Sequence, residues 1–596
     1  MATKPWPLGD EVIFDIELYP NFFMCGVKHI KSQTYMALSD PKQMSYILWG
    51  YKVIGFNSFN YDVPIIKAAI KGASLDELRE ISRDIIFREL RMGNRNDRFN
   101  HIDIIEVAPL QESLKTYAGR LHCERMQDLP FDPALPLSDA QKEIVTDYCF
   151  NDLDNTELLY EELRPFIALR ETLGEKYGME LRSKSDAQIA EAVIMHELEN
   201  ITGYPVERPN YSEGYTFRYK VPDWLSFYTA PLQIALDTIT NATFSLDKNG
   251  SPMLPEEIAK LNIGIGTSNY KMGIGGLHST EKSIAHKSTN SIQLSDFDVA
   301  SFYPAIILNC GLTPKHLGEN FLIVFRTLVE RRLIAKGKNK VEADALKILV
   351  NGTFGKLGSP YSRLYAPELL IQVTMTGQLA LLMLIESLDD SDLPVVSANT
   401  DGVIVKYDKD DYHKLYSKAK HWEAVTGFVL EETQFKATYN RDVNNFINVK
   451  TDGEIKAKGI YTELGSALNS RLSKNPETLV ISDALKAFLS VGTPLRDTVE
   501  ACQDMRRFVA IRKATGGAHK DGVYLGKVVR WYYAKGATGV ISKMNGDAVP
   551  KTEGAKPLML LAGLEPDIDY DWYVNAAESA LFDLGYYQRP TERKLL

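Results

Sequence analysis

The sequence lacks paired cysteines, long apolar runs and low-complexity tracts, and each absence excludes a class of protein. Its five cysteines lie far apart, without a Cys-x-x-Cys pair, which excludes a zinc ribbon and a disulfide framework. No apolar run approaches the ~18 residues of a membrane span, and the first residues lack the apolar core of a signal peptide. We therefore expect an intracellular protein that does not bind a membrane.

The chain has the length and composition of a large soluble protein. Its 596 residues exceed one hydrophobic core and predict roughly three to five domains. The apolar fraction of 44% and the charged fraction of 24% are ordinary for globular proteins. A net charge of -10 argues weakly against a general nucleic-acid coat, but it permits a local basic groove.

Carboxylates recur near the ends of predicted strands in the first part of the chain. Residues 12–18 alternate like a strand, which places Asp15 and Glu17 on one face. A second apolar run, 53–57, leads into a polar turn that ends at Asp62. Each acid taken alone is more simply a solvated surface residue. Together, acids at strand ends can bind hard divalent ions, which prefer carboxylate oxygen.

A helix is expected over residues 138–159, with Ser138 as its N-cap. Tyr148 and Asp152 are four positions apart and therefore share a face of that helix. With the strand acids, Asp152 would complete a set of four carboxylates. Two divalent ions held by such a set can activate a water and stabilise the leaving oxygen of a phosphodiester. A phenol beside them, here Tyr148, can orient the water.

A second group of acids follows in the middle of the chain. Residues 296–299 alternate like a strand, with Asp296 and Asp298 on one face, and Pro304 is expected to end it. Two apolar runs flank Asp401-Gly402, which predicts a β-hairpin with Asp401 at its turn. A second hairpin around 452–453 would place Lys456 and Lys458 on one side of its return strand.

Basic residues are spaced by one helical turn between residues 320 and 352, where the pattern predicts two helices. Arg332 and Lys336 are four apart on the first helix, and Lys347 and Asn351 are four apart on the second. Across a helical hairpin these groups can hold a triphosphate. The alternative is a solvated basic face.

The segment 506–535 carries eight Lys or Arg, including Arg530, against the single acid Asp521. Trp531, Tyr532 and Tyr533 are interleaved with these cations. This local reversal of charge predicts a phosphate-binding groove, and the alternative is again a solvated face.

Seven short motifs occur in the order found in family B DNA polymerases that carry a 3′–5′ proofreading exonuclease, and the chain resembles the compact bacteriophage members of that family. The motifs are Asp15-x-Glu17, Asn57-x-x-x-Tyr61-Asp62, Tyr148-x-x-x-Asp152, Asp298-x-x-Ser301-Phe302-Tyr303-Pro304, Lys347-x-x-x-Asn351-Gly-Thr-Phe-Gly355, Asn399-Thr400-Asp401 and Lys456-Ala457-Lys458-Gly459. The paired glycines Gly275-Gly276 stand where the family often has a turn near the template strand, although a plain β-turn explains them equally well.

The resemblance implies an α/β multidomain fold. A ribonuclease H-like DEDDy exonuclease domain would precede a right-hand polymerase with palm, fingers and thumb. The implied domains are exonuclease 1–165, connector 166–290, palm 291–315, fingers 316–355, palm again 356–462, and thumb with the C-terminal region 463–596.

The resemblance also implies roles for individual residues. Two Mg²⁺ ions in each active site, which Mn²⁺ can replace, would be held by Asp298 and Asp401 in the polymerase and by the four N-terminal acids in the exonuclease. The substrates would be primer-template DNA and deoxynucleoside triphosphates. The residues implied to bind the nucleotide are Arg332, Lys336, Lys347, Asn351, Tyr303, Val299 and Ser301. Those implied to bind DNA are Asn57, Tyr61, Gly275, Gly276, Lys456, Lys458 and Arg530.

Within these roles, Tyr148 would position the nucleolytic water, and Tyr303 would pack under the sugar and reject a 2′ hydroxyl. The short stretch between Asp298 and Lys347 leaves little room for the insertion of protein-primed members, which favours a nucleic-acid primer. We expect a monomer that replicates a phage genome in the cytoplasm of a bacterial host.

Three positions depart from the family pattern. Asn399 replaces the first Asp of the catalytic hairpin, Gly402 replaces a common Ser, and Phe354 replaces a common Tyr. Asp296 matches no ligand position of the pattern. Two alternatives therefore stay open: a protein in which only the nuclease works because Asn399 has disabled the polymerase, and a non-catalytic protein that binds primer-template DNA.

Overall fold

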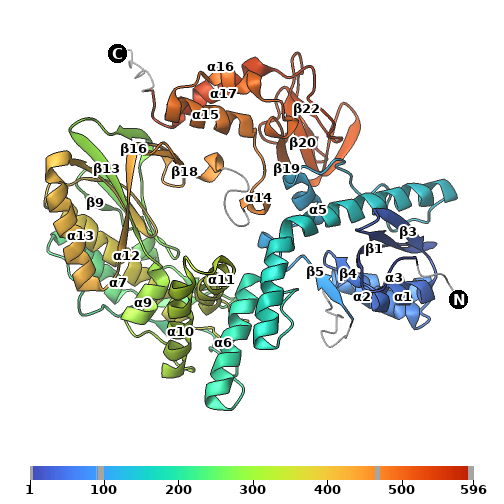
Figure 1. The fold of residues 1–596 in the computed structure, drawn as a ribbon, viewed down its shortest axis with the longest axis horizontal. Helices are drawn as coiled ribbons and strands as arrows, with labels where there is room; N and C mark the ends of the chain where they lie inside the picture. The colour runs from blue at the N-terminus through green and yellow to red at the C-terminus, as the bar shows by residue number, and fades with distance from the viewer. Residues whose placement is uncertain (1–4, 89, 91–98, 463–469, 588–596) are drawn as a thin grey trace. The chain divides into compact units, whose positions relative to one another are not determined.

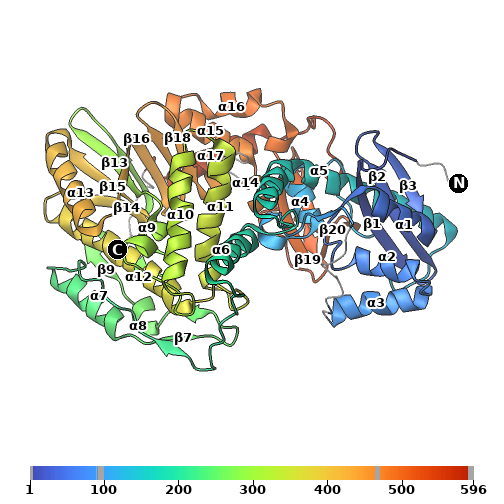
Figure 2. The ribbon, with the colours of Figure 1, turned by 60° about the horizontal axis from the view of Figure 1, so that its bottom comes forward.

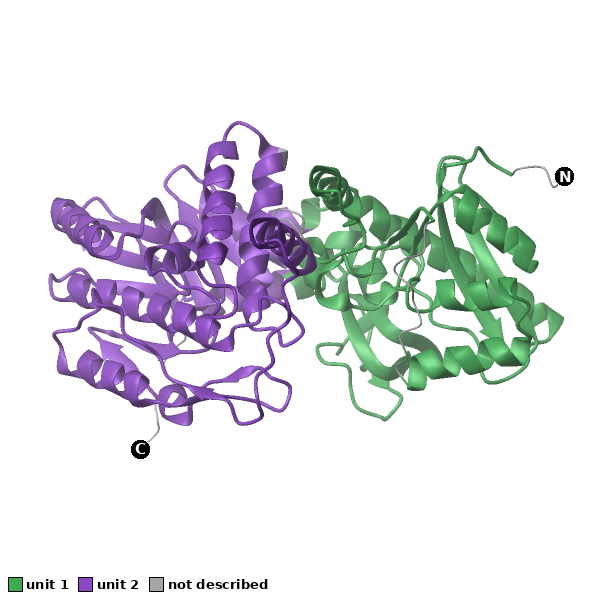
Figure 3. Cartoon of the chain, turned by 90° about the horizontal axis from the view of Figure 1, so that it is seen from below, with its two compact units in different colours: residues 1–185, 463–480, 500–573 green, residues 186–462, 481–499, 574–596 purple. Residues whose placement is uncertain are grey.

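The computed structural model describes residues 5–88, 90, 99–462 and 470–587. These residues form a mixed α/β protein with two compact units (Figure 3). Unit 1 contains residues 1–185, 463–480 and 500–573, and unit 2 contains residues 186–462, 481–499 and 574–596. The chain thus passes between the units several times.

A five-stranded sheet forms the centre of the N-terminal part of unit 1. Its order is β3-β2-β1-β4-β5, with β1, β4 and β5 parallel to one another and β2 and β3 antiparallel to their neighbours. The strands are β1 (Glu11–Tyr19), β2 (Phe22–His29), β3 (Thr34–Leu38), β4 (Lys52–Gly55) and β5 (His101–Asp103).

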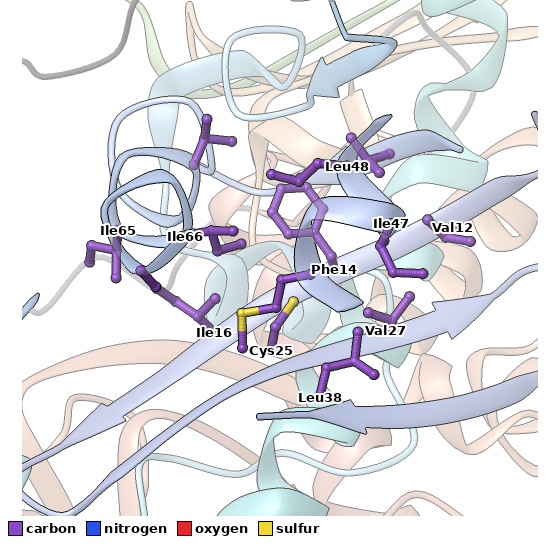
Figure 4. Packing of buried hydrophobic residues seen from close by; sticks show 14 of the residues in the cluster. Val12, Phe14, Ile16, Cys25, Val27, Leu38, Ile47, Leu48, Ile65 and Ile66 are labelled. Carbon is purple, nitrogen blue, oxygen red and sulfur yellow. The ribbon is translucent and has the colours of Figure 1, made fainter. Parts of the chain in front are cut away.

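Alternation along β1 gives this sheet two apolar faces. Val12, Phe14 and Ile16 pack with residues of α1 (Pro41–Gly50), α2 (Asp62–Ile70) and α3 (Leu75–Phe87) (Figure 4). Ile13 lies on the opposite face and packs against the long helix α5 (Asp139–Tyr177). Asp15 and Glu17 follow the period of Ile13, so β1 presents both acids on the face that α5 covers.

The rest of unit 1 consists of α4 (Leu114–Arg120), α14 (Ser470–Ser473) and a four-stranded sheet of order β21-β19-β20-β22. Its strands are β19 (Ala510–Lys520), β20 (Val523–Tyr533), β21 (Ser542–Lys543) and β22 (Ala555–Pro557). Helices α15 (Leu479–Val491), α16 (Leu495–Ala501) and α17 (Tyr570–Asp583) each contain a point at which the chain changes unit.

Unit 2 is built on a ten-stranded sheet of order β18-β17-β16-β13-β15-β14-β11-β10-β9, with β12 paired to β16. The strands are β9 (Ile263–Ile265), β10 (Ser268–Met272), β11 (Leu277–Ser279), β12 (Lys282–Lys287), β13 (Ile292–Val299), β14 (Val395–Asn399), β15 (Gly402–Asp408), β16 (Leu430–Asp442), β17 (Asn445–Lys450) and β18 (Ile455–Lys458). A separate small sheet contains β6 (Thr216–Phe217), β7 (Phe244–Leu246) and β8 (Pro252–Met253).

Helices of unit 2 pack on and beside the ten-stranded sheet. They are α6 (Asp186–Thr202), α7 (Ala230–Asn241), α8 (Glu256–Ala259), α9 (Phe302–Asn309), α10 (Glu319–Ala335), α11 (Lys340–Leu357), α12 (Pro367–Asp389) and α13 (Tyr412–Thr426). Helix α12 packs on the sheet (Figure 1), and α10 lies beside α11 (Figure 2). By length and composition α12 could cross a membrane, but 78% of its apolar stretch is buried inside the fold.

Several local predictions are confirmed. Ser138 caps α5 through a capping box with Gln141, both hairpins form, and the pair of helices forms as α10 and α11. The predicted domain boundaries stay a prediction, since the two compact units divide the chain more coarsely. Helix α5 continues past residue 165, and the segment predicted as one thumb, 463–596, is shared between the two units. Strand β13 also ends at Val299, before Pro304, because Ser301 adopts a left-handed conformation (φ 50°) from which α9 begins.

Candidate active sites

Four carboxylates of unit 1, which we call the first centre, come together as the motif order predicts. Asp15 and Glu17 lie on β1, Asp62 is the first residue of α2, and Asp152 lies on α5. An oxygen of Asp62 accepts a hydrogen bond of 3.2 Å from the backbone N–H of Ile16, between the two strand acids. Three separate elements thus deliver the carboxylates to one place.

Burial and mutual repulsion raise the pKa values of three of these acids. Burial, and next the charge of Asp152, raise the pKa of Asp15 to about 7. Burial and the charge of Asp15 raise the pKa values of Glu17 and Asp62 well above their usual range. The pKa of the Tyr148 phenol is also raised, by burial and by Asp152, so the phenol keeps its proton and can donate it in a hydrogen bond. A cation bound here would relieve the repulsion among the acids.

Lys115 of α4 supplies a cation to this centre. Its ammonium contacts the carboxylate of Asp152 and lies 4.4 Å from the ring centroid of Tyr148. Sequence reasoning missed this residue, because Lys115 lies outside every motif and reaches the centre only when α4 packs on α5.

Cys149 contributes to packing at the first centre, where its sulfur and oxygens of Asp15 and Glu17 all lie within 4.8 Å of one another. Burial raises the thiol pKa far above its usual range, so Cys149 stays protonated. A Cβ at Gly26, the β2 partner of Asp15, would lie 2.5 Å from the Cys149 sulfur. Gly26 therefore permits the close approach of α5 to the sheet, while the carboxylates form the donor set that fits a hard divalent ion.

The turn that precedes α2 is held by Asp103. The carboxylate of Asp103 accepts from the backbone N–H groups of Asn57 (2.8 Å) and Phe59 (2.9 Å), and Asn57 has a positive φ of 55°. Asp103 therefore has a structural role, which is to fix the backbone of this turn. The hydroxyl of Tyr61 hydrogen bonds to that of Ser82 at 2.9 Å, and contacts of Asn57 and Tyr61 with DNA stay predictions.

Unit 2 brings Asp298 and Asp401 together at the ends of neighbouring strands. Asp298 is the register partner of Gly402 on β15, and the N–H of Val299 donates to the carbonyl of Asp401 at 2.7 Å. The hairpin of β14 and β15 is thereby fastened to β13. A cavity of about 540 Å³ opens at this point and is lined by four acids and four cations. They are Asp296, Asp298, Asp401 and Glu431, with Arg332, Lys336, Lys456 and Lys458.

We call Asp296, Asp298, Asp401 and Lys456 the second centre. The ammonium of Lys456 lies 2.7 Å from Asp296 and 2.8 Å from Asp298. Burial and the charge of Asp298 raise the pKa of Asp296 to about 6, and the same two causes raise the pKa of Asp401. Burial opposes the charge of Lys456, but the two aspartates outweigh it and raise the pKa of the ammonium.

Arg332 and Ser301, which line the cavity, and Tyr303, which lies outside its lining, are fixed by contacts with other residues. Arg332 donates to the hydroxyl of Ser301 at 3.1 Å. Tyr303 stacks on Phe354, with ring centroids 4.4 Å apart, and its hydroxyl donates to the carbonyl of Gly275 at 2.5 Å. The paired-glycine turn also meets the catalytic hairpin, since a Cβ at Gly276 would lie 3.0 Å from the Thr400 side chain.

Only some of the residues predicted to bind the nucleotide face this cavity. Val299, Ser301, Arg332 and Lys336 line it. Lys336 also forms an ion pair of 3.7 Å with Glu431. Lys347 and Asn351 are exposed on α11 and lie outside the cavity lining that the structure describes.

The prediction that Arg530 binds DNA is wrong, because its side chain is fully buried. Its guanidinium donates to the backbone carbonyls of Cys123 (2.6 Å) and Leu558 (2.8 Å). The aromatic residues Trp531, Tyr532 and Tyr533 are buried core residues of β20. Other cations of the same segment pair within unit 1: Arg512 with Glu477, and Lys513 with Glu112. These three of the eight cations of this segment thus take part in internal contacts.

The structure gives physical reasons for the departures from the family pattern. The amide of Asn399 donates to the carbonyl of Val443 at 2.6 Å, a bond that an ionised Asp could not make. A Cβ at Gly402 would lie 2.3 Å from a carboxylate oxygen of Asp298, so any larger residue would displace that acid. Phe354 needs only its ring to stack on Tyr303.

No family model matches the chain, and no curated protein matches it. Among solved structures, the chain is similar to the family B DNA polymerase from the hyperthermophilic archaeon Pyrobaculum calidifontis, with 15% sequence identity and a TM-score of 0.39, over 99% of this chain and 80% of that one. This likeness is too distant to carry a functional argument, which rests on the motifs and the two centres.

Proposed function

We propose that the protein is a template-directed DNA polymerase that extends a primer 3′ end and proofreads with a 3′–5′ exonuclease. The observation that carries the proposal is the cavity of unit 2, where Asp298 and Asp401 face Arg332 and Lys336. Two aspartates can hold divalent ions, and two cations can bind the phosphates of a nucleoside triphosphate. Acids and cations that share one cavity suit phosphoryl transfer to a bound nucleotide.

In the polymerase reaction the primer hydroxyl attacks the α-phosphate of a deoxynucleoside triphosphate. Two Mg²⁺ ions held by Asp298 and Asp401 would lower the pKa of that hydroxyl and neutralise charge on the leaving pyrophosphate. Arg332 and Lys336 would bind the outer phosphates. The ring of Tyr303, fixed by Phe354, would exclude a 2′ hydroxyl, and Lys458 would contact the primer backbone.

In the exonuclease reaction, Asp15, Glu17, Asp62 and Asp152 would hold the metal ions. The protonated phenol of Tyr148 would orient the attacking water on the scissile phosphate. Asn57 and Tyr61 would contact the frayed single strand. In this proposal the N-terminal sheet with α5 is the ribonuclease H-like domain, the ten-stranded sheet is the palm, and α10 with α11 forms the fingers. A phage source and a bacterial cytoplasm as the working compartment belong to the same proposal.

The test uses a 5′-labelled primer annealed to a longer template, with Mg²⁺, in the presence and absence of deoxynucleotides. Asp298→Asn should abolish extension and keep degradation, and Asp15→Asn should abolish degradation and keep extension. Each loss should reach about a thousandfold, because each variant removes a carboxylate from a metal site. Chelation of the metal should abolish both activities.

The two variants are controls for each other, because each removes one carboxylate charge and changes only one unit. Degradation without any extension by the unaltered protein would refute the polymerase and favour a nuclease. Binding of the primer-template with neither activity would favour a non-catalytic DNA-binding protein.

A further inference from the structure

Asn399 leaves the catalytic hairpin with one carboxylate fewer than the family pattern. The contact of its amide with Val443 shows that this position is built for a hydrogen-bond donor. The hydroxyl of Thr400 donates to the side-chain oxygen Oδ1 of Asn399 at 3.2 Å, and this bond fixes the orientation of the side-chain amide. A carboxylate at position 399 would place an oxygen opposite the Val443 carbonyl oxygen. Neither atom carries a hydrogen, so this hydrogen bond would be lost. Any replacement for the missing charge must therefore come from elsewhere.

Asp296 places a carboxylate in the same cavity from the neighbouring strand. It lies between Ile404 on β15 and Thr433 on β16, in the interior of the sheet, and is only 4% exposed. Burying a carboxylate there costs free energy unless a partner compensates it. That partner is Lys456, which Asp296 shares with Asp298.

This shared contact has a consequence for metal binding. An ion that binds Asp298 must compete with the ammonium of Lys456, which lies 2.8 Å from that carboxylate. Asp296 offers the ammonium a second carboxylate at 2.7 Å, so Lys456 can release Asp298 without leaving the centre. The centre then has three aspartates, as many as the family pattern, which has an Asp at position 399 and none at 296.

We propose that Asp296 is a positioning residue of the second centre: it replaces the charge missing at Asn399 and holds Lys456 away from Asp298 when a divalent ion binds. The proposal rests on the proposed function, since it assigns a role within the same site. Asp296 acts on the ion through Lys456 and through its charge.

The test measures Mn²⁺ binding by electron paramagnetic resonance in the full-length protein without DNA, with Asp15→Asn and Asp152→Asn in every sample to weaken the first centre. Adding Asp296→Asn should weaken Mn²⁺ binding about tenfold, because one nearby charge is lost and the ammonium turns to Asp298. Adding Lys456→Met to that variant should restore the affinity, since the competing cation is gone. Primer extension should stay impaired in the double variant.

Glu431→Gln is the matched control, because it removes a charge from the same cavity at a residue that pairs with Lys336 instead of Lys456. Its Mn²⁺ affinity should change less than about twofold. Equal weakening by Glu431→Gln and Asp296→Asn would refute the specific role of Asp296. Unchanged affinity in Asp296→Asn, or no recovery with Lys456→Met, would refute it as well.

Two further measurements keep the proposal falsifiable. If Asp296→Asn does not fold, Lys456→Met alone should raise Mn²⁺ affinity, and an unchanged affinity would overturn the proposal. Extension by the unaltered protein with no effect of Asp296→Asn on Mn²⁺ binding would reject this inference and leave the polymerase standing. Absence of extension by the unaltered protein would reject the proposed function itself.

Discussion

The two centres gather acids in different electrostatic surroundings. In the first, Glu17, Asp62 and Asp152 are no more than 7% exposed. In the second, the side chain of Asp298 is 41% exposed at the edge of a cavity. In the first centre burial and repulsion raise the pKa values of Asp15, Glu17 and Asp62, and Lys115 contacts only Asp152. In the second centre Lys456 contacts two aspartates, Asp296 and Asp298. The comparison teaches that carboxylates gathered at one place can be stabilised without a metal ion mainly by protonation in a buried centre and mainly by a shared lysine beside an open cavity.

The largest effect is expected from Gly402→Ser, which tests how closely the open centre is packed. A side chain at 402 would push against the Asp298 carboxylate, whose oxygen lies 2.3 Å from the Cβ position. Misplacing a reacting group by about 1 Å can cost about a hundredfold. Extension of a labelled primer should therefore fall about a hundredfold, with degradation unchanged as the internal control. Normal extension would show that Asp298 has room to move.

The second prediction compares the two lysines in metal-free protein. Lys115→Met should lower the free energy of unfolding by about 3 kcal/mol, because it leaves buried Asp152 unpaired. Lys456→Met should cost about 1 kcal/mol, since its side chain is 39% exposed and the buried Asp296 that it leaves, with a pKa raised to about 6, can take up a proton. Urea unfolding measures both. Lys142→Met, which removes an exposed pair with Asp139, is the control and should change little. Equal losses for Lys115 and Lys456 would remove the contrast between the centres.

The third prediction concerns pH. Folded Asp15 binds its proton more tightly than the unfolded chain does, because burial and Asp152 raise its pKa from 3.8 to about 7. The resulting stability is present below about pH 4 and is lost as the pH rises through about 7. Without metal, stability should fall over this range by an amount on the order of 2 kcal/mol more than in Asp15→Asn.

Saturating Mg²⁺ should remove that difference, because the ion takes the place of the proton. Parallel pH profiles of the unaltered protein and Asp15→Asn in chelator would contradict the third prediction.

The smallest effect is expected from Gly26→Ala, which tests the packing of the buried centre. Its Cβ would meet the Cys149 sulfur and force α5 away from β1. Degradation should fall about tenfold, an overpacking cost of about 1.4 kcal/mol. Cys149→Ala should restore degradation in the double variant, because it removes the obstructing atom. Failure of this rescue would show that Gly26 serves another purpose.

Local patterns predicted the parts of the fold that depend on neighbours in sequence. The alternation of β1, the Ser138 cap and the turn around Asp401 follow from rules that act over a few residues. The order of the motifs indicated which acids would meet. Both kinds of signal are present in the residues themselves.

Other features depend on contacts between segments that are distant in sequence. The basic segment around Arg530 is typical of a charged surface, but Arg530 itself lies in the core. There its guanidinium donates hydrogen bonds to the carbonyls of Cys123 and Leu558. Lys115 has no motif of its own and reaches Asp152 only through the packing of α4 on α5. The repeated passage of the chain between units has the same origin, because no local rule states which unit a segment joins.

The hydrogen bond from Tyr303 to the carbonyl of Gly275 has a consequence for the sugar selection that we propose for Tyr303. Its acceptor is a main-chain atom, so no side-chain replacement at 275 deletes that atom. Variation in sugar selectivity must therefore arise at the ring itself or at Phe354, which supports it from the other helix. Among related chains we therefore expect the hydrogen bond to the carbonyl of residue 275 to persist while the residue at position 354 varies.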